Sequence, residues 1–170
     1  FIFLKVDRDK KGKKALIFPR YQQRRAVNRV LEDMKVNHTD SNYLIQHSAG
    51  SGKTNTIAWL AHSLVSLHDH EDRNIVDAVL IVTDRIVVDR QLQDAVQAIQ
   101  HQPGVIKVMD DKATSSDLAD ALAGNTKIIA TTIHKFAQIN KSDWMTAGPT
   151  AQKRFAILID EAHSSTTGSY

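Results

Sequence analysis

Cysteine is absent from all 170 residues of the sequence. A disulfide framework and thiolate-bound metal sites are therefore excluded, and the absence fits a reducing compartment. Apolar runs stay well short of the roughly 20 residues that span a membrane, and the first residues show no signal-peptide pattern. We therefore predict a cytoplasmic protein that does not associate with a membrane.

An excess of charge of one sign is also missing. The chain has 22 basic against 19 acidic residues, so net charge alone does not indicate a nucleic-acid partner. Internal repeats and low-complexity segments are absent as well, and 42% of the residues are hydrophobic, enough for the core of one domain. Basic residues do gather in two places, which are Lys10, Lys11, Lys13 and Lys14, and Arg20, Arg24, Arg25 and Arg29.

The most informative stretch is the glycine-containing turn over residues 46–54. An apolar segment at 42–46 precedes it, which we interpret as a strand, and apolar residues at helical spacing follow from Ile57 to Val65. Strand, glycine turn, Lys-Thr and helix are the context of a phosphate-binding loop. The alternative is an ordinary strand–turn–helix corner that contains two glycines.

Glycines allow backbone N–H groups to converge on one point at a helix N-terminus, where the helix dipole favours an anion. Lys53 would reach the β- and γ-phosphates of a nucleotide, and the Thr54 hydroxyl would bind Mg²⁺. One departure is that His47 stands where such loops usually have their first glycine. The predicted nucleotide-binding loop residues are Ala49, Gly50, Ser51, Gly52, Lys53 and Thr54.

A second chemical motif follows an apolar segment at residues 154–159. It reads Asp160-Glu161-Ala162-His163. Carboxylates at the C-terminal end of a strand lie where open α/β sheets bind ligands. Asp160 would hold the Mg²⁺ that Thr54 also contacts, and Glu161 would orient or deprotonate the attacking water. We therefore predict that Lys53, Asp160 and Glu161 are the catalytic residues. The alternative is a strand that ends in a solvated acidic turn.

The remaining pattern predicts a β-hairpin at residues 1–18, whose lysine-rich tip is either a solvated turn or a wedge that contacts phosphates. A helix follows Pro19, and Ser115 or Ser116 caps a short later helix. Strands and helices alternate from residue 42 onward, which indicates a parallel α/β sheet. The predicted strands are 42–46, 76–82, 105–109, 127–132 and 154–159.

A metal site is an alternative interpretation of the polar loop at residues 68–73. It contains two histidines and three carboxylates. All of these candidate ligands crowd into one short loop, and no cysteine accompanies them, which favours a solvated loop.

The two chemical motifs, Ala49–Thr54 and Asp160–His163, resemble motifs I and II of superfamily 2 helicases and translocases. Within that superfamily, the chain resembles the motor of the restriction (R) subunit of type I restriction–modification enzymes. The stretches that carry this resemblance extend over residues 18–163. They are Phe18-Pro19-Arg20-Tyr21-Gln22-Gln23 with Ala26 and Val27, His47 within motif I, Leu80-Ile81-Val82-Thr83-Asp84-Arg85 with Asp89 and Gln91, and Thr131-Thr132-Ile133-His134-Lys135-Phe136, where His134 replaces a more usual Gln.

This resemblance implies a RecA-like fold of the P-loop NTPase type, a parallel sheet flanked by helices, over residues 19–170, with 1–18 a hairpin from an upstream domain. It implies that Gln23 reads the adenine edge, with Gln22 as runner-up, and that His163 couples nucleotide state to a second motor lobe. The residues implied to contact the nucleic-acid backbone are Thr83, Arg85, Thr132 and Lys135. The alternative is that Arg85 and Lys135 are solvated charges and that the threonines pack in strands.

The implied activity is that of an ATP- and Mg²⁺-dependent translocase on double-stranded DNA. Such an R subunit associates with methylation and specificity subunits, and its nuclease motif is not visible in this sequence. The alternatives are a different DNA or RNA helicase of the superfamily, and a non-motor nucleotide switch or chaperone-type ATPase.

A further expectation concerns the sheet of this motor family, in which the strand after motif II inserts between the phosphate-loop strand and the Asp160 strand. The sequence has no apolar strand after His163, so we expect a gap between 42–46 and 154–159. Residues 1–170 alone would then be poorly soluble and without ATPase activity.

Overall fold

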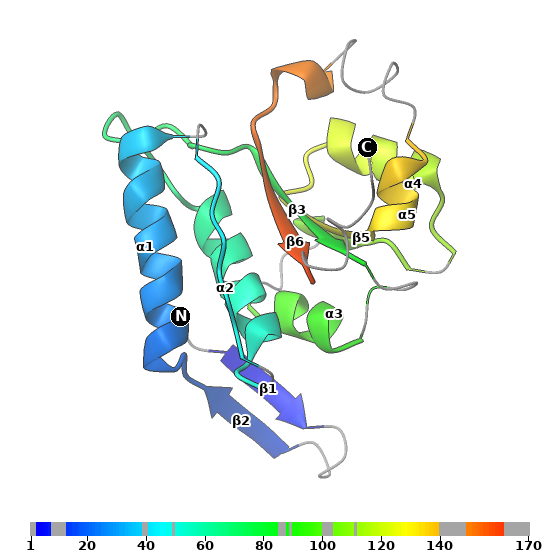
Figure 1. Ribbon diagram of the computed structural model, residues 1–170. Helices are drawn as coiled ribbons and strands as arrows, with labels where there is room; N and C mark the ends of the chain where they lie inside the picture. The colour runs from blue at the N-terminus through cyan, green and yellow to red at the C-terminus, as the bar shows by residue number, and fades with distance from the viewer. Residues whose placement is uncertain are drawn as a thin grey trace.

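The computed structural model describes residues 3–7, 13–38, 41–48, 50–84, 88, 90–99, 104–110, 112–139 and 149–161. They form a hairpin, a long helix and a parallel α/β unit (Figure 1). No helix within these ranges combines the length and apolar character that a membrane span needs.

The predicted N-terminal hairpin is confirmed. Strands β1 (Phe3–Asp7) and β2 (Lys13–Ile17) pair antiparallel, with Phe3 opposite Ile17. The lysine-rich tip at residues 8–12 lies outside the described residues, so its two interpretations stay open. Helix α1 (Tyr21–Asn37) begins shortly after Pro19, as predicted, and buries Val27, Val30 and Met34 on one face.

Within the described residues, the main sheet has four parallel strands in the order β4 (Ile106–Val108), β5 (Ile128–Thr132), β3 (Ala78–Thr83) and β6 (Phe155–Asp160). Every residue of β3 and β5 is buried. Continuous apolar runs are typical of parallel strands that are covered on both faces. The predicted parallel α/β class is therefore confirmed.

Helices cover both faces of this sheet (Figure 1). Val79 and Ile81 of β3 pack in a core with α1, α2 (Lys53–Val65) and α3 (Arg90–Gln97). Leu80 and Val82 point to the other face, where α4 (Ser115–Ala123) and α5 (Ile133–Ala137) complete a second core. A 3₁₀ helix, η1 (Pro149–Gln152), leads into β6. Successive side chains of β3 point to opposite faces of the sheet, so this strand contributes to both cores and joins the two helical layers.

The predicted strand at 42–46 is wrong, because residues 41–48 belong to no strand. In the described part of the chain, β6 is the edge strand of the sheet and pairs only with β3. An apolar segment becomes a strand only where another strand accepts its hydrogen bonds. Tyr43 instead donates its hydroxyl to Asp33 Oδ2 at 2.6 Å, and Leu44 is 88% exposed.

The predicted cap of α4 also needs correction, because Thr114 caps the helix in place of Ser115 or Ser116. Thr114 Oγ1 accepts from the Asp117 backbone N–H at 3.2 Å, and Asp117 Oδ2 accepts from the Thr114 backbone N–H at 2.7 Å. This reciprocal pair is a capping box, with Asp in place of Glu or Gln.

The polar loop at 68–73 is held by its own ion pairs. Asp69 accepts backbone hydrogen bonds from Arg73 and Glu71 and pairs with the Arg73 guanidinium at 3.0 Å. The backbone N–H of Arg73, followed by these other contacts, lowers the pKa of Asp69 to about 2. No group of three metal-ligating side chains occurs among the described residues.

Candidate functional site

The glycine turn ahead of α2 has the backbone geometry of an anion-binding loop. Gly50 has φ +71° and Gly52 has φ +88°, a region that favours glycine because a Cβ atom is strained there. The Ser51 N–H bonds to the Ser48 carbonyl at 3.1 Å, and no side chain from the described residues caps α2. The first turn of α2 can therefore offer N–H groups to an anion. Ala49 lies outside the described residues.

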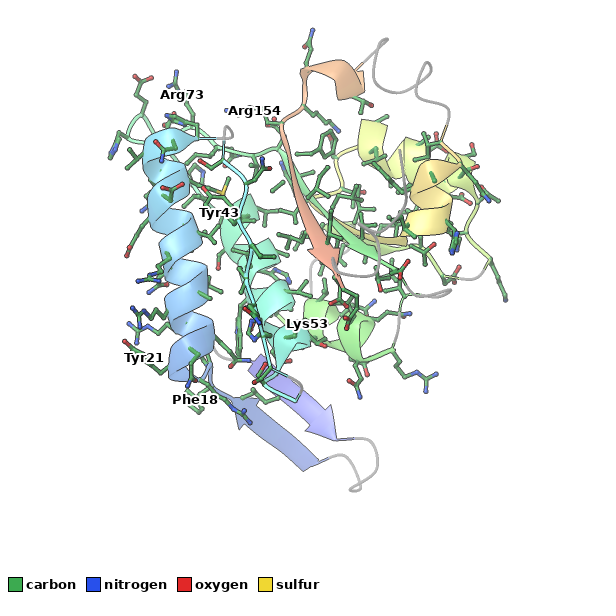
Figure 2. The ribbon with its side chains drawn as sticks, in the orientation of Figure 1. Phe18, Tyr21, Tyr43, Lys53, Arg73 and Arg154 are labelled. Carbon is green, nitrogen blue, oxygen red and sulfur yellow. The ribbon has the colours of Figure 1, made fainter. Side chains whose placement is uncertain are left out.

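Lys53, which is labelled in Figure 2, meets both predicted carboxylates at the C-terminal end of β6. Its ammonium lies 3.0 Å from Asp160 Oδ1 and forms an ion pair with Glu161 Oε1. Burial lowers the pKa of Lys53, but hydrogen bonds to the two carboxylates outweigh burial and raise it. Glu161 has φ +59°, a strained backbone for a residue with a side chain. The two motifs thus meet at a single point.

Asp160 and Thr54 offer the oxygen ligands that Mg²⁺ prefers. The Asp160 side chain is 9% exposed, and its Oδ1 is reached within the described residues only by the Lys53 ammonium. Thr54 directly follows Lys53 in the first turn of α2. A buried carboxylate oxygen without a full set of partners fits a metal ligand.

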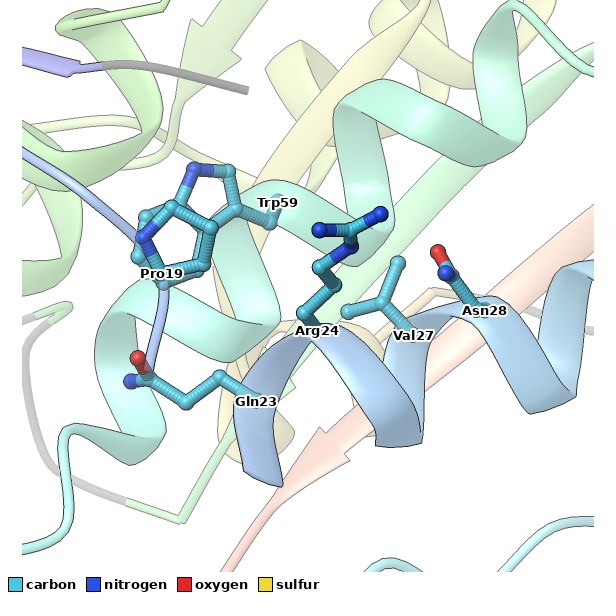
Figure 3. A pocket seen from close by; sticks show the side chains of 6 residues that line it. All are labelled: Pro19, Gln23, Arg24, Val27, Asn28 and Trp59. Carbon is cyan, nitrogen blue, oxygen red and sulfur yellow. The ribbon is translucent and has the colours of Figure 1, made fainter. Parts of the chain in front are cut away.

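A cavity of about 380 Å³ opens between the first turn of α1 and the phosphate loop. Its lining residues are Arg20, Gln22, Gln23 and Ala26 from the α1 side and Ile45, Gln46, His47, Ser48, Gly50 and Ser51 from the loop side. A second recess, of about 10 Å³, lies under α1 between Trp59 and Val27 (Figure 3). That volume is about one water probe, so only the larger cavity can hold a ligand.

Gln23 is 4% exposed, and its amide contacts the backbone of the loop. Its Nε2 donates to the Gly52 carbonyl at 2.9 Å and to the Ser51 carbonyl at 3.4 Å, and its Oε1 accepts from the Arg20 N–H at 2.8 Å. The neighbouring Gln22 is exposed and lines the cavity. No local pattern predicts the contact between Gln23 and the loop, because 29 residues separate Gln23 from Gly52.

His47 takes part in the loop through a contact that its sequence position did not indicate. Its Nδ1 lies 2.9 Å from Ser51 Oγ, which ties the two ends of the turn together. Burial, followed by the nearby Lys53 charge, lowers the pKa of His47. The imidazole is therefore favoured in its neutral form beside the loop.

Two of the residues implied to contact nucleic acid, Thr83 and Thr132, lie at the ends of neighbouring strands. Thr83 of β3 is in register with Thr132 of β5 on one side and with Asp160 of β6 on the other. Both threonines are 1% exposed. Thr132 Oγ1 accepts from the Lys135 N–H at 3.3 Å, and the Lys135 ammonium donates to the Asp110 carbonyl. Arg85 and His163 lie outside the described residues.

Comparison with known proteins gives three similarities. A family model described as SWI2/SNF2 ATPase matches residues 22–170. A candidate type I restriction enzyme MjaVIIIP endonuclease subunit from Methanocaldococcus jannaschii is 26% identical over 188 residues, 99% of this chain and 18% of that protein. The crystal structure of the UvsW helicase from bacteriophage T4 matches with a TM-score of 0.63 and 17% identity, over 98% of this chain and 48% of that chain.

These matches have different weight. The family match covers most of the chain, whereas the chain spans only 18% of the restriction subunit that it resembles. At 17% identity the helicase match shows the fold alone, and it confirms the predicted RecA-like arrangement of a parallel sheet flanked by helices.

Proposed function

Because this chain belongs to the SWI2/SNF2 ATPase family, we propose that it is the N-terminal lobe of an ATP-driven motor that moves along double-stranded DNA. The motor would be part of the restriction subunit of a type I restriction–modification enzyme. We assign the lobe to residues 19–170 and the hairpin at 1–18 to a preceding domain. The similarity to a candidate restriction endonuclease subunit supports this assignment.

The observation that carries the proposal is the contact of Lys53 with Asp160 and Glu161. These groups are more than a hundred residues apart in the sequence, and the fold brings them to the N-terminus of α2. A phosphate loop beside two carboxylates is the arrangement that nucleotide hydrolysis uses. An ordinary strand–turn–helix corner would give no reason for this contact.

The chemistry follows from these contacts. The N–H groups of the loop and the Lys53 ammonium bind the β- and γ-phosphates, so the phosphates compete with the carboxylates for Lys53. Once the phosphates have drawn Lys53 away from Glu161, the Glu161 carboxylate can orient or deprotonate the attacking water. Asp160 and Thr54 would hold Mg²⁺, which would supply charge neutralisation on the phosphates. Gln23 is assigned to the nucleotide site.

We propose that nucleic acid binds at the ends of the strands next to this site. In this assignment Thr83, Arg85, Thr132 and Lys135 face the DNA backbone, and His163 couples the nucleotide to a second lobe. The register of Thr83 with Thr132 and Asp160 supports a common edge for both functions. The methylation and specificity subunits of the complex are the proposed protein partners.

A second candidate is a nucleotide switch that does not move on DNA. The burial of Thr83 and Thr132 favours it, because both side chains already serve the fold. A helicase that separates strands is the remaining alternative, and the likeness to the UvsW helicase concerns the fold.

The experiment that separates these candidates is triplex displacement by the intact protein with its partner subunits. A DNA-bound third strand should be displaced in the presence of ATP, and ATP hydrolysis should rise when double-stranded DNA is added. ATP hydrolysis that is indifferent to DNA would instead support a switch. Release of one strand from a forked duplex would support a helicase.

A further inference from the structure

We propose that the outer face of α1 is a second contact surface for double-stranded DNA, on which Arg24, Arg25 and Arg29 bind backbone phosphates. Together with Tyr21, these residues are called the arginine face below. The inference rests on the proposed function, because it takes double-stranded DNA to be the ligand. It adds a surface on a different element from the strand ends that are assigned to DNA above.

The exposed residues of α1 carry the first step. The apolar residues of this helix face the core, whereas all four residues of the arginine face are exposed. Tyr21 is 72% exposed and points away from the core (Figure 2). Tyr21, Arg25 and Arg29 follow one another at four-residue steps, so they form a strip about 12 Å long on one side of the helix. The guanidinium groups of this strip are therefore presented to solvent.

The charges of the arginine face oppose the stability of the helix. Residues 20–31 contain four arginines and no acidic residue, and the first turn of α1 is without an acidic residue as well. A helix dipole disfavours cations near the N-terminus, and the like charges of Arg25 and Arg29 repel each other at four-residue spacing. Cations at places that helix stability disfavours are explained by a ligand of opposite charge.

The arginine face also has no carboxylate partner within the described residues. Asp33 lies one helical turn beyond Arg29, which is the spacing at which an ion pair forms on a helix. Its two oxygens are already used, because Asn37 donates to Oδ1 at 2.9 Å and the Tyr43 hydroxyl donates to Oδ2 at 2.6 Å. The charge of the arginine face is therefore not neutralised by its own helix.

Two other exposed arginines show the contrast. Arg73 pairs with Asp69 and Glu71 at 3.0 and 2.9 Å, and Arg154 pairs with Asp77 at 3.4 Å. Figure 2 labels both at the opposite end of the molecule from the first turn of α1. Their guanidinium groups are already matched by carboxylates, whereas those of the arginine face can bind an anion without giving up an internal partner.

The residue types of the arginine face favour a phosphate backbone as that anion. Arginine can bind phosphate through two parallel hydrogen bonds, and a tyrosine hydroxyl is among the usual donors to backbone phosphates. A duplex carries about one charge per 1.7 Å of its axis, so a strip of about 12 Å faces about seven phosphates. An exposed helix with guanidinium groups along this length therefore fits the backbone of double-stranded DNA.

The arginine face lies on the same helical turn that contacts the phosphate loop. Gln23 and Arg25 lie on opposite sides of the first turn of α1, and the Gln23 amide donates to the Gly52 carbonyl at 2.9 Å. A phosphate bound to Arg25 would therefore lie at the same end of the molecule as the nucleotide site, on the outer side of α1.

The salt dependence of DNA binding tests this surface. We would titrate a duplex of unrelated sequence with the intact protein and its Arg25→Gln/Arg29→Gln variant, because glutamine keeps the helix propensity of arginine and removes its charge. Each lost phosphate contact lowers the salt slope by about 0.9. The variant should bind DNA more weakly at low salt, and its loss of affinity between about 50 and about 200 mM salt should be about tenfold smaller.

Arg73→Gln/Arg154→Gln is the matched control, because it removes two exposed arginines that are already paired with carboxylates. Its salt slope should equal that of the unmodified protein. Arg25→Glu/Arg29→Glu reverses the charge and should weaken DNA binding more than the glutamine variant does. ATP hydrolysis without DNA should stay unchanged in all of these variants, which shows that they are folded.

An unchanged salt slope in both Arg25/Arg29 variants, with ATP hydrolysis that still responds to DNA, would overturn the inference alone. Loss of a partner subunit from the complex at an unchanged salt slope would also overturn it and would assign the arginine face to a protein. If the unmodified protein does not bind DNA, the inference and the proposed function both fail. The expected change of slope in a protein that displaces no third strand would support the arginine face and overturn the motor.

Discussion

The two regions that the sequence assigns to ligands use their polar groups differently. At the phosphate loop, Lys53 and Glu161 are about one-third exposed and hold each other in an ion pair. At the adjacent strand ends, Thr83 and Thr132 are 1% exposed, and Lys135 donates to the Asp110 carbonyl. The first region can exchange its internal partners for a ligand, whereas the second uses its side chains inside the fold.

This difference shows that motif residues at strand ends need not act through their side chains. Thr132 caps α5 and so sets the direction of Lys135, which makes it a support for a contact and not the contact itself. In the described part of the chain, Lys53 does not have a capping role of this kind. The nucleotide side should therefore be far more sensitive to substitution than the nucleic-acid side.

Lys53→Ala is expected to have the largest effect. Removing one preorganised charge at a reacting phosphate costs on the order of 3–4 kcal/mol, or roughly 10²- to 10³-fold in rate. ATP hydrolysis by the intact protein should fall at least that far, measured as phosphate release with and without DNA. Lys112→Ala, at an exposed lysine, is the control and should hydrolyse ATP normally. Equal rates in both variants would place the phosphate site elsewhere.

Glu161→Gln should stop turnover but keep ATP bound. The amide removes the base for the attacking water, and it also removes an ion pair that competes with the phosphates for Lys53. Calorimetry should therefore give an ATP affinity equal to or higher than that of the unmodified protein, while phosphate release stops. Loss of binding together with turnover would mean that Glu161 holds the loop and is not the base.

Sequence patterns could predict the parts of this molecule that depend on local chemistry. β3 and β5 were predicted because a strand buried on both faces is continuously apolar, and the loop was predicted because glycine and lysine spacing reflects its turn. The segment at 42–46 contains a short apolar run, but a strand also needs a partner, and no local pattern shows one. The contact between Gln23 and Gly52 could not be predicted from the sequence for the same reason.

Lys135→Ala and Thr132→Val test the nucleic-acid side, with an effect of only a few-fold. If the Lys135 ammonium leaves Asp110 to bind a DNA phosphate, Lys135→Ala should weaken DNA binding evenly across sequences and lower the salt slope by roughly one unit. Thr132→Val loses the cap and should weaken binding through the same lysine. DNA titrations at several salt concentrations would measure both. An unchanged slope would make Lys135 a structural residue and would strengthen the nucleotide-switch candidate.

The smallest expected effect is a shift in the pKa of His47, which reports the charge inside the phosphate loop. Burial and then the Lys53 charge lower this pKa below its ordinary value of 6.5. The unfolded chain therefore binds more protons than the folded loop as the pH falls below 6.5, so the loop is most stable above that pH and loses stability below it. Lys53→Ala removes the repelling charge while leaving the burial, so the His47 pKa should rise part of the way toward 6.5. An NMR titration of the His47 ring protons in both proteins would measure this. If the two titration curves coincided, Lys53 would not act on the loop through its charge, and the contrast between the two regions would rest on geometry alone.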